Sequence, residues 1–267
     1  MKKTILSLCA VLVASSTFAL EWNPQPTSEQ HLIGVSVGWV DKTMKGQMPN
    51  DLSLNEGVIW KEFNQSLTGL RWSNGKPQDK VGNTLQVGFT ITPEFTYGIG
   101  IQTGLYYEWT MNTYNHNIGS ERYEARKNNH EISIPLRLQW RYELVGGLSL
   151  FAFTGPSFDF GLLYSERTNE YHDGKLYSKT FHNAYTGASS VKYPNNKEQN
   201  SSNKDRNAKD YKAFHPYWGF GLGLQWEYIR VQLTSDWGIM DVNAHTGEYE
   251  KPIYFNKPIS VSFSYLF

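Results

Sequence analysis

Large apolar side chains alternate with small or polar ones along much of this chain, most clearly between His130 and Tyr142. There Ile, Leu, Trp and Tyr occupy every second position, and the positions between them include Glu131, Arg137 and Arg141. Consecutive residues of a strand point to opposite faces, so a period of two predicts a β-strand with one apolar and one polar face. A helix in a soluble core would not place two arginines and a glutamate at this spacing.

The same period recurs and predicts eight strands. Each segment is close to the roughly 9 to 11 residues that a tilted membrane-spanning strand needs. The facing of the fifth is ambiguous, because Phe151 and Phe153 share a face with Ser149, Gly155 and Asp159. The predicted strands cover residues 31–39, 83–92, 97–109, 130–142, 148–162, 217–228, 229–237 and 259–267.

Short turns alternate with long polar connections between these strands. The turns fall at residues 93–96, 143–147 and about 228–230, whereas the long connections cover about residues 40–82, 110–129, 163–216 and 238–257. Short turns on one side and long loops on the other are typical of outer-membrane barrels. The expected fold is therefore all-β: an eight-stranded antiparallel up-and-down transmembrane β-barrel with long extracellular loops.

Two features modify this expectation. Asp173-Gly174 suits a two-residue hairpin turn, so the fifth strand is expected to extend beyond the membrane. A ten-strand barrel is the alternative, but only polar sequence is available there for a further span. In the first loop, residues 58–63 and 67–72 are unusually apolar and are expected to pack over the barrel mouth or to meet a partner.

Aromatic side chains gather toward the ends of the predicted strands, which indicates two interfacial girdles. The alternative, core aromatics of a soluble β-sandwich, would place them toward the middles. The last strand ends on the terminal residue, Phe267, and together with Phe263 and Tyr265 this outward row is expected to be the recognition end for the barrel-assembly machinery. The girdle tryptophans are Trp39, Trp109, Trp140, Trp218, Trp226 and Trp237.

The N-terminus predicts export. Lys2 and Lys3 precede a short apolar run, and small residues lead to Ala19, which is typical of a signal peptide covering residues 1–19. A lipid anchor on Cys9 is disfavoured because Leu8 stands where a small residue is needed. Residues 20–267 are then the outer-membrane barrel domain, without cysteine.

Composition and charge narrow the class of protein. Without Lys2 and Lys3, the 25 basic residues fall to 23 against 25 acidic ones, so no basic footprint for nucleic acid is expected. Aromatic residues make up 15% of the chain, although its mean hydropathy is negative. A barrel reconciles these values, because only alternate residues of each strand face lipid.

The barrel interior is predicted to hold a network of ion pairs and amides. Eight strands leave just enough width for side chains, so a wide pore is not expected, and charges in such a space must pair or retain water. A gated path for small ions through rearranged pairs is the alternative. The predicted inward charges are Glu108, Glu131, Arg137, Arg141, Asp159, Glu227 and Asp236.

No enzyme activity, cofactor or metal site is expected. Five histidines fall in loops or at strand mouths, where polar loops provide Ser-His-acid sets by chance. The sequence has no His-Glu-x-x-His spacing, no Gly-rich phosphate loop and no nucleophile elbow. A lipid-modifying enzyme is therefore the third hypothesis, after a surface-interaction barrel and a narrow porin-like channel.

Two adjacent predicted strands resemble a known family. Residues 132–142, Ile-Ser-Ile-Pro-Leu-Arg-Leu-Gln-Trp-Arg-Tyr, and residues 150–156, which end in Gly-Pro, are similar to strands of the PorT-like, porin-family outer-membrane barrels common in Bacteroidota. The resemblance implies an eight-stranded barrel with a porin-like or assembly-accessory role and no catalytic residues. The expected partners are outer-membrane lipid and lipopolysaccharide, the barrel-assembly machinery, and an external ligand or protein bound by the loops.

Overall fold

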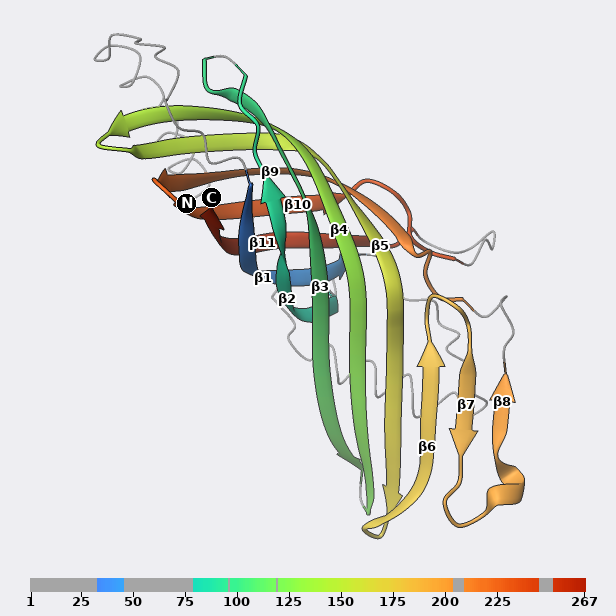
Figure 1. Cartoon of the computed structure of the whole chain (residues 1–267). Helices are drawn as coiled ribbons and strands as arrows, with labels where there is room; N and C mark the ends of the chain where they lie inside the picture. Colours follow the sequence, from blue (N-terminus) through green and yellow to red (C-terminus); the bar gives the residue numbers. More distant parts are fainter. Residues whose placement is uncertain (1–32, 46–78, 96, 119, 204–208, 245–251) are drawn as a thin grey trace, which may run out of the picture.

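The computed structural model describes residues 33–45, 79–95, 97–118, 120–203, 209–244 and 252–267. The predicted signal peptide and the apolar stretches of the first loop lie outside these residues. The described chain forms eleven strands and one short 3-10 helix, η1 (Figure 1). Their bounds are β1 Ile33–Lys45, β2 Asp79–Ile91, β3 Ile99–Ile118, β4 Glu121–Val145, β5 Leu148–His172, β6 Lys175–Asn183, β7 Ser189–Lys192, η1 Lys197–Gln199, β8 Ser201–Asn203, β9 Phe214–Trp226, β10 Ile229–Gly238 and β11 Tyr254–Leu266.

Eight of these strands pair into a closed ring. Neighbours follow the order β1, β2, β3, β4, β5, β9, β10 and β11, and every pair is antiparallel. Pairing of β1 with β11, in which Gly34 faces Leu266, closes the ring. The prediction of eight strands in antiparallel order is confirmed. Among the described residues there is no helix long and apolar enough to cross a membrane.

The alternation along each ring strand separates two environments. In β4, Ile134, Leu136 and Leu138 are exposed on the outer face, whereas the residues between them are buried in the ring. The ambiguous facing of β5 is resolved, because Phe151 and Phe153 are both buried inside. The ring is thus apolar outside and mostly polar inside, the reverse of a soluble domain.

Two of the four predicted long loops, residues 110–129 and 163–216, contain paired strands, which corrects that part of the expected fold. Residues 110–129 form a hairpin in which β3 and β4 stay paired as far as Ile118 and Glu121. Within residues 163–216, β5 continues to His172 and turns at Asp173-Gly174 into β6. Both turn residues have positive φ, 49° and 75°, as a type I′ turn requires. Polarity on both faces of a segment places it outside hydrocarbon, but does not prevent strand pairing.

Strand β5 changes its partner along its length. As far as Phe160, β5 pairs with β9, and from Ser165 onward it pairs with β6. Strand β4 is its other neighbour along the whole length. The ends of β3, β4 and β5 that run beyond the ring therefore form a six-stranded extension with β6, β7 and β8, drawn at the bottom of Figure 1. We call this extension the extended sheet, and we call the end of the ring nearest to it the upper end.

A cluster of buried apolar side chains lies where the ring meets the extended sheet. It combines ring residues with Ala184, Tyr185, Tyr211 and Val242 from the connecting segments. Backbone hydrogen bonds tie these segments together: the amides of Asp210 and Tyr211 donate to the carbonyl of Ala184, and that of Ala184 donates to Tyr164. We call this layer the cap. Its ring members are Met44, Val81, Tyr164, Tyr217 and Phe255, with Ile253 just before β11.

Candidate functional site

The inward face of the ring carries a charged cluster beneath the cap. Lys42 of β1 forms an ion pair with Glu131 of β4. Lys257 of β11 lies 2.7 Å from Glu108 Oε1 of β3 and 2.7 Å from Asp159 Oδ2 of β5. All five side chains are at most 3% exposed, so each charge depends on its neighbours for compensation.

Two more side chains complete the surroundings of Glu131. The Tyr185 hydroxyl donates to Glu131 Oε1 at 2.8 Å, and His215 Nδ1 lies 3.2 Å from the same oxygen. His215 Nε2 lies 2.6 Å from the carbonyl oxygen of Lys212. A carbonyl oxygen can only accept a hydrogen bond, so Nε2 is the donor in this contact.

Three carboxylates at one place raise the question of a metal ion. Oxygens of Glu108, Glu131 and Asp159 lie within 4.8 Å of one another, and divalent cations such as Ca²⁺ prefer carboxylate ligands. The ammonium groups of Lys42 and Lys257 already contact these oxygens. A metal ion would have to displace both, so the arrangement favours an internal ion-pair network.

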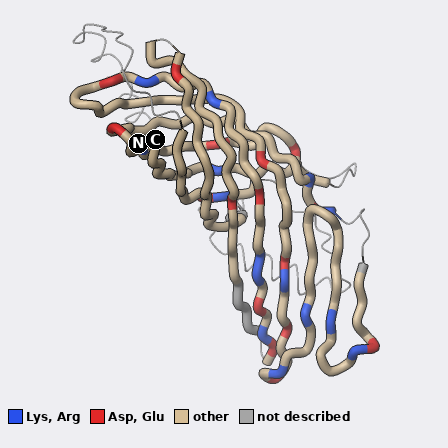
Figure 2. The backbone as a smooth tube through the Cα atoms, in the orientation of Figure 1, with Lys and Arg blue, Asp and Glu red and all other residues tan. Residues whose placement is uncertain are grey.

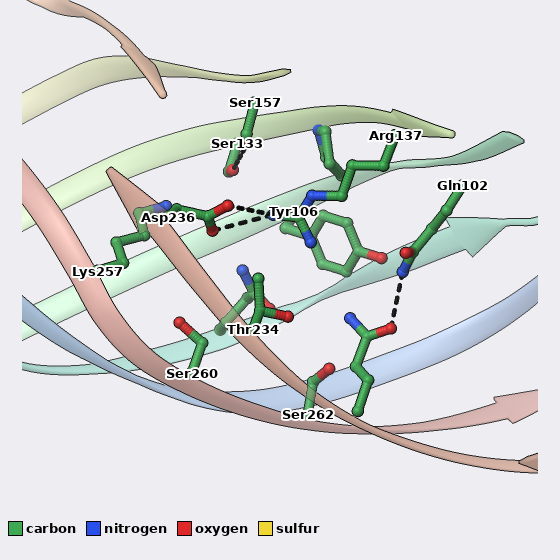
Figure 3. A pocket seen from close by; sticks show the side chains of 13 residues that line it. Gln102, Tyr106, Ser133, Arg137, Ser157, Thr234, Asp236, Lys257, Ser260 and Ser262 are labelled. Carbon is green, nitrogen blue, oxygen red and sulfur yellow. Dashed lines mark hydrogen bonds and ion pairs between the residues drawn. The ribbon is translucent and has the colours of Figure 1, made fainter. Parts of the chain in front are cut away.

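A second polar layer fills the middle of the ring. Arg137 Nη2 donates to both oxygens of Asp236, at 2.8 and 2.9 Å, across the interior from β4 to β10. Gln102 donates to Gln232 at 2.8 Å (Figure 3). The space left beside these groups is about 20 Å³, and one water needs about 10 to 15 Å³. This pocket has room for one or two waters.

At the end of the ring away from the cap, aromatic rings pack against glycines and fill the interior. The Arg230 guanidinium lies 3.7 Å from the centre of the Phe151 ring and donates to Gln139. A Cβ at Gly223 would lie 2.3 Å from that ring, so only glycine leaves space for Phe151 at this position. Arg141 pairs with Glu94 at 2.6 Å at the lower rim. Gly221 and Gly223 of β9 thus leave space for the Phe153 and Phe151 rings, whereas Gly219 leaves space for the Asp236 side chain.

The structure brings most of the predicted interior charges into these layers. Glu108, Glu131, Arg137 and Asp236 are buried in the ring, and Arg141 lies at its lower end. Glu227 does not belong to the network: it is an exposed turn residue between β9 and β10 with φ of 49°. A two-residue turn needs positive φ, which removes this residue from the strand alternation.

Several partners were missed, most of them because they lie outside the predicted strands. Lys42 continues the inward phase of β1 beyond the predicted strand 31–39, whereas Arg230 lies within the predicted strand 229–237 but falls in the predicted turn at about 228–230. Lys257 follows no such phase, because the register between β10 and β11 shifts between Thr234 and Asp236. Tyr185 comes from the cap, which has no periodic pattern at all.

The predicted interfacial aromatics point away from the ring. Trp109 stacks on His130 of the neighbouring strand, with ring centres 6.3 Å apart, and Trp218 lies opposite Trp237 in the register. Phe263, Tyr265 and Phe267 are 46 to 61% exposed on the outer side of β11. The six tryptophans, Trp39, Trp109, Trp140, Trp218, Trp226 and Trp237, are 36 to 57% exposed.

One titratable pair joins the extended sheet to the cap. His182 Nε2 of β6 lies 2.7 Å from Asp210 Oδ2. Burial lowers the pKa of His182, but the hydrogen bond and the charge of Asp210 outweigh it and raise this pKa above its usual value.

Comparison with known proteins adds little. No family model and no curated protein matches the chain. Among solved structures, Ail, the attachment invasion locus protein of Yersinia pestis, aligns over 88% of this chain and 97% of its own. Its complex with the heparin analogue sucrose octasulfate has a TM-score of 0.36 and 10% identity, and another structure of it has 0.27 and 8%. The NanC porin aligns over 88% and 100% of the two chains, at a TM-score of 0.21 and 7% identity. Scores this low support no conclusion about function, and the PorT-like resemblance stays a prediction.

Proposed function

We propose that this protein is a bacterial outer-membrane β-barrel with a filled interior that presents its extended sheet to the outside. The observation that carries the proposal is the inverted distribution of side chains. Large apolar residues cover the outer face of the ring, whereas lysine, arginine and carboxylates are buried inside it. In water this outer face would be a large exposed apolar patch, whereas in a bilayer it would contact the apolar lipid tails.

The dimensions fit a bilayer. On β9, Trp218 and Trp226 bracket three outward apolar residues over eight residue steps. At about 3.3 Å per residue, this is roughly 26 Å along the strand and, at a tilt near 40°, about 20 Å along the membrane normal. The apolar band of outer-membrane barrels is roughly 25 Å tall.

The interior supports a structural or surface-interaction role over a narrow channel. The cap covers the mouth, the charged cluster lies beneath it, and the Arg137–Asp236 layer follows below. A conducting path would have to break several buried ion pairs, each at a cost of about 3 to 5 kcal/mol. We therefore expect purified protein in planar bilayers to show no stable conductance steps.

We also propose that the protein is not an enzyme. The described histidines have partners in the fold: His130 contacts Tyr107, His172 contacts Glu170, and His182 contacts Asp210. His215 is enclosed in the charged cluster. Assays of hydrolase and acyltransferase activity on the purified barrel in lipid test this, and turnover that is lost in a His215→Ala variant would contradict it.

Refolding and protease protection test the location and the role together. The refolded chain should insert into lipid vesicles, show heat-modifiable mobility on gels, and remain protease-resistant within the ring. Replacing residues 189–207 by a short Gly-Ser linker removes β7 and β8 but keeps the cap, and it should leave insertion intact while reducing capture of partners from native outer membranes. A chain that is monomeric in buffer without detergent would contradict the proposed location, and failure of the linker variant to fold would make β7 and β8 structural.

A further inference from the structure

The outer face of the extended sheet carries two like-charge pairs side by side. In the register, Arg126 of β4 lies directly opposite Arg167 of β5, and Lys179 of β6 lies directly opposite Lys192 of β7. All four side chains are exposed. Like charges directly opposite each other on one face destabilise a sheet, so this arrangement calls for a counter-charge.

The protein itself supplies little of that counter-charge. Within the described part of the chain, no carboxylate forms an ion pair with any of these four cations. Glu124 lies on the same face, but it is paired with Arg122 and accepts a hydrogen bond from Tyr171. The acidic residues of this region belong instead to the opposite face, where Glu166 pairs with Lys127 and Glu170 accepts from Ser178. Figure 2 shows Lys and Arg recurring along β4 to β7.

The four cations border a broad cleft of about 760 Å³. Its floor includes Phe181, and the Arg167 guanidinium lies 5.8 Å from the centre of that ring. Arg126 bonds only weakly to its neighbours, donating to Asn128 at 3.4 Å and to the Met111 sulfur at 3.4 Å. The cleft thus combines exposed cations with an apolar floor.

The height of the cleft above the apolar band of the ring places the cleft near lipid headgroups. Arg126 lies four residues beyond His130, which stacks on the girdle residue Trp109. Four residues span roughly 13 Å along the strand, or about 10 Å along the normal at a 40° tilt. The polar region of each leaflet is roughly 5 to 8 Å thick, and long Arg and Lys side chains reach several ångströms toward it. Because the cleft is on the same face as the lipid-facing residues, it overhangs the surrounding leaflet.

We propose that Arg126, Arg167, Lys179 and Lys192 bind the phosphate groups of a phosphorylated glycolipid in the outer leaflet. This inference rests on the proposed outer-membrane location. Paired guanidinium groups match phosphate oxygens in geometry, and the paired ammonium groups add point charge. Binding relieves both repulsive pairs at once and anchors the extended sheet against the membrane surface.

The experiment compares matched pairs of substitutions in nanodiscs. Arg126→Gln/Arg167→Gln and Lys179→Gln/Lys192→Gln each remove one like-charge pair, and Lys175→Gln/Lys197→Gln removes the same charge from exposed positions outside the cleft. The full chain is reconstituted with bisphosphorylated lipid A or with dephosphorylated lipid A, and retained lipid is counted by native mass spectrometry. We expect each cleft variant to bind phosphorylated lipid A about 30-fold more weakly, from about 1 kcal/mol per cation. The control variant should match the wild type.

Thermal unfolding provides a second measurement, in which the cleft variants should differ from the wild type in opposite directions in two lipids. In phosphate-free zwitterionic lipid, both cleft variants should unfold at the same temperature as the wild type or higher, because repulsion is removed. In phosphorylated lipid, only proteins with an intact cleft should gain stability. Equal responses of cleft and control variants, or no difference between the two lipid A forms, would overturn the inference. Stronger binding of a soluble sulfated oligosaccharide than of lipid A would also overturn it. Failure to insert into any bilayer would instead contradict the proposed function.

Discussion

Lys257 is the side chain whose loss should disturb the interior most. Its ammonium group contacts both Glu108 and Asp159 at 2.7 Å, and its side chain is 3% exposed. The change Lys257→Met keeps much of the side-chain length and removes the charge. It leaves two buried carboxylates close to each other without their shared cation.

The expected loss follows from the cost of an uncompensated buried charge. Removing one partner of a buried ion pair costs about 3 to 5 kcal/mol, and here one cation serves two carboxylates. We therefore expect the free energy of unfolding to fall by at least about 3 kcal/mol. The triple change Lys257→Met/Glu108→Gln/Asp159→Asn should recover most of this loss, because replacing all members of a buried ionic group is often nearly neutral.

Urea unfolding in lipid vesicles, followed by tryptophan fluorescence, measures these differences. Lys175→Met, at an exposed position after the β5–β6 turn, is the control and should change the free energy by no more than about 0.5 kcal/mol. A Lys257→Met protein within about 1 kcal/mol of the wild type would refute the ion-pair account of the interior. A triple variant no more stable than the single one would refute the compensation argument.

Three further changes test other parts of the molecule. Deleting Phe267, exposed at the end of β11, should reduce the fraction of heat-modifiable protein in the outer membrane by more than its lost burial explains. Gly223→Ala should cost about 1 to 3 kcal/mol in urea unfolding, because its Cβ would meet the Phe151 ring. The raised pKa of His182 means that its pair with Asp210 stabilises the cap fully below pH about 6.5 and that this stabilisation is lost as pH rises through the folded-state pKa. Hydrogen exchange in the cap should therefore quicken with pH beyond the intrinsic increase, and a His182→Gln variant should lack this extra dependence.

A specific result would contradict each of these three predictions. Normal insertion of the chain without Phe267 would show that the terminal aromatic is not an assembly signal. A Gly223→Ala protein with unchanged stability would mean that the Phe151 ring moves freely. Equal pH dependence of hydrogen exchange in the wild type and the His182→Gln variant would show that this pair does not hold the cap.

The ring could be predicted from the sequence because its apolar outer face and its polar interior follow a strict period of two. All eight ring strands overlap the predicted segments, and the turn at Asp173-Gly174 falls where its residue types require. Several predicted strands were too short, because strand pairing beyond the apolar band of the ring carries no apolar alternation. The sequence of residues 110–129 is mostly polar, and yet β3 and β4 stay paired there as far as Ile118 and Glu121.

The carboxylates of the charged cluster could be predicted from the sequence, but their partners could not. The three carboxylates lie within the alternating segments, but their cations come from a strand continuation, Lys42, and from a register shift before Lys257. Tyr185 reaches Glu131 through the cap, which joins segments far apart in the chain. Such contacts depend on tertiary closure, and no local pattern encodes them.

The change of partner along β5 makes the segment between the top of β5 and the start of β9 an insertion between two neighbouring ring strands. The chain leaves the ring at the top of β5 and returns at Phe214, which pairs with Phe160 just below the point of departure. Both anchor points belong to the ring, so a different hairpin could replace β7 and β8 without altering the register of any ring strand. The protein would thus be a scaffold on which new surface-binding segments can evolve or be grafted, provided that the residues forming the cap are kept.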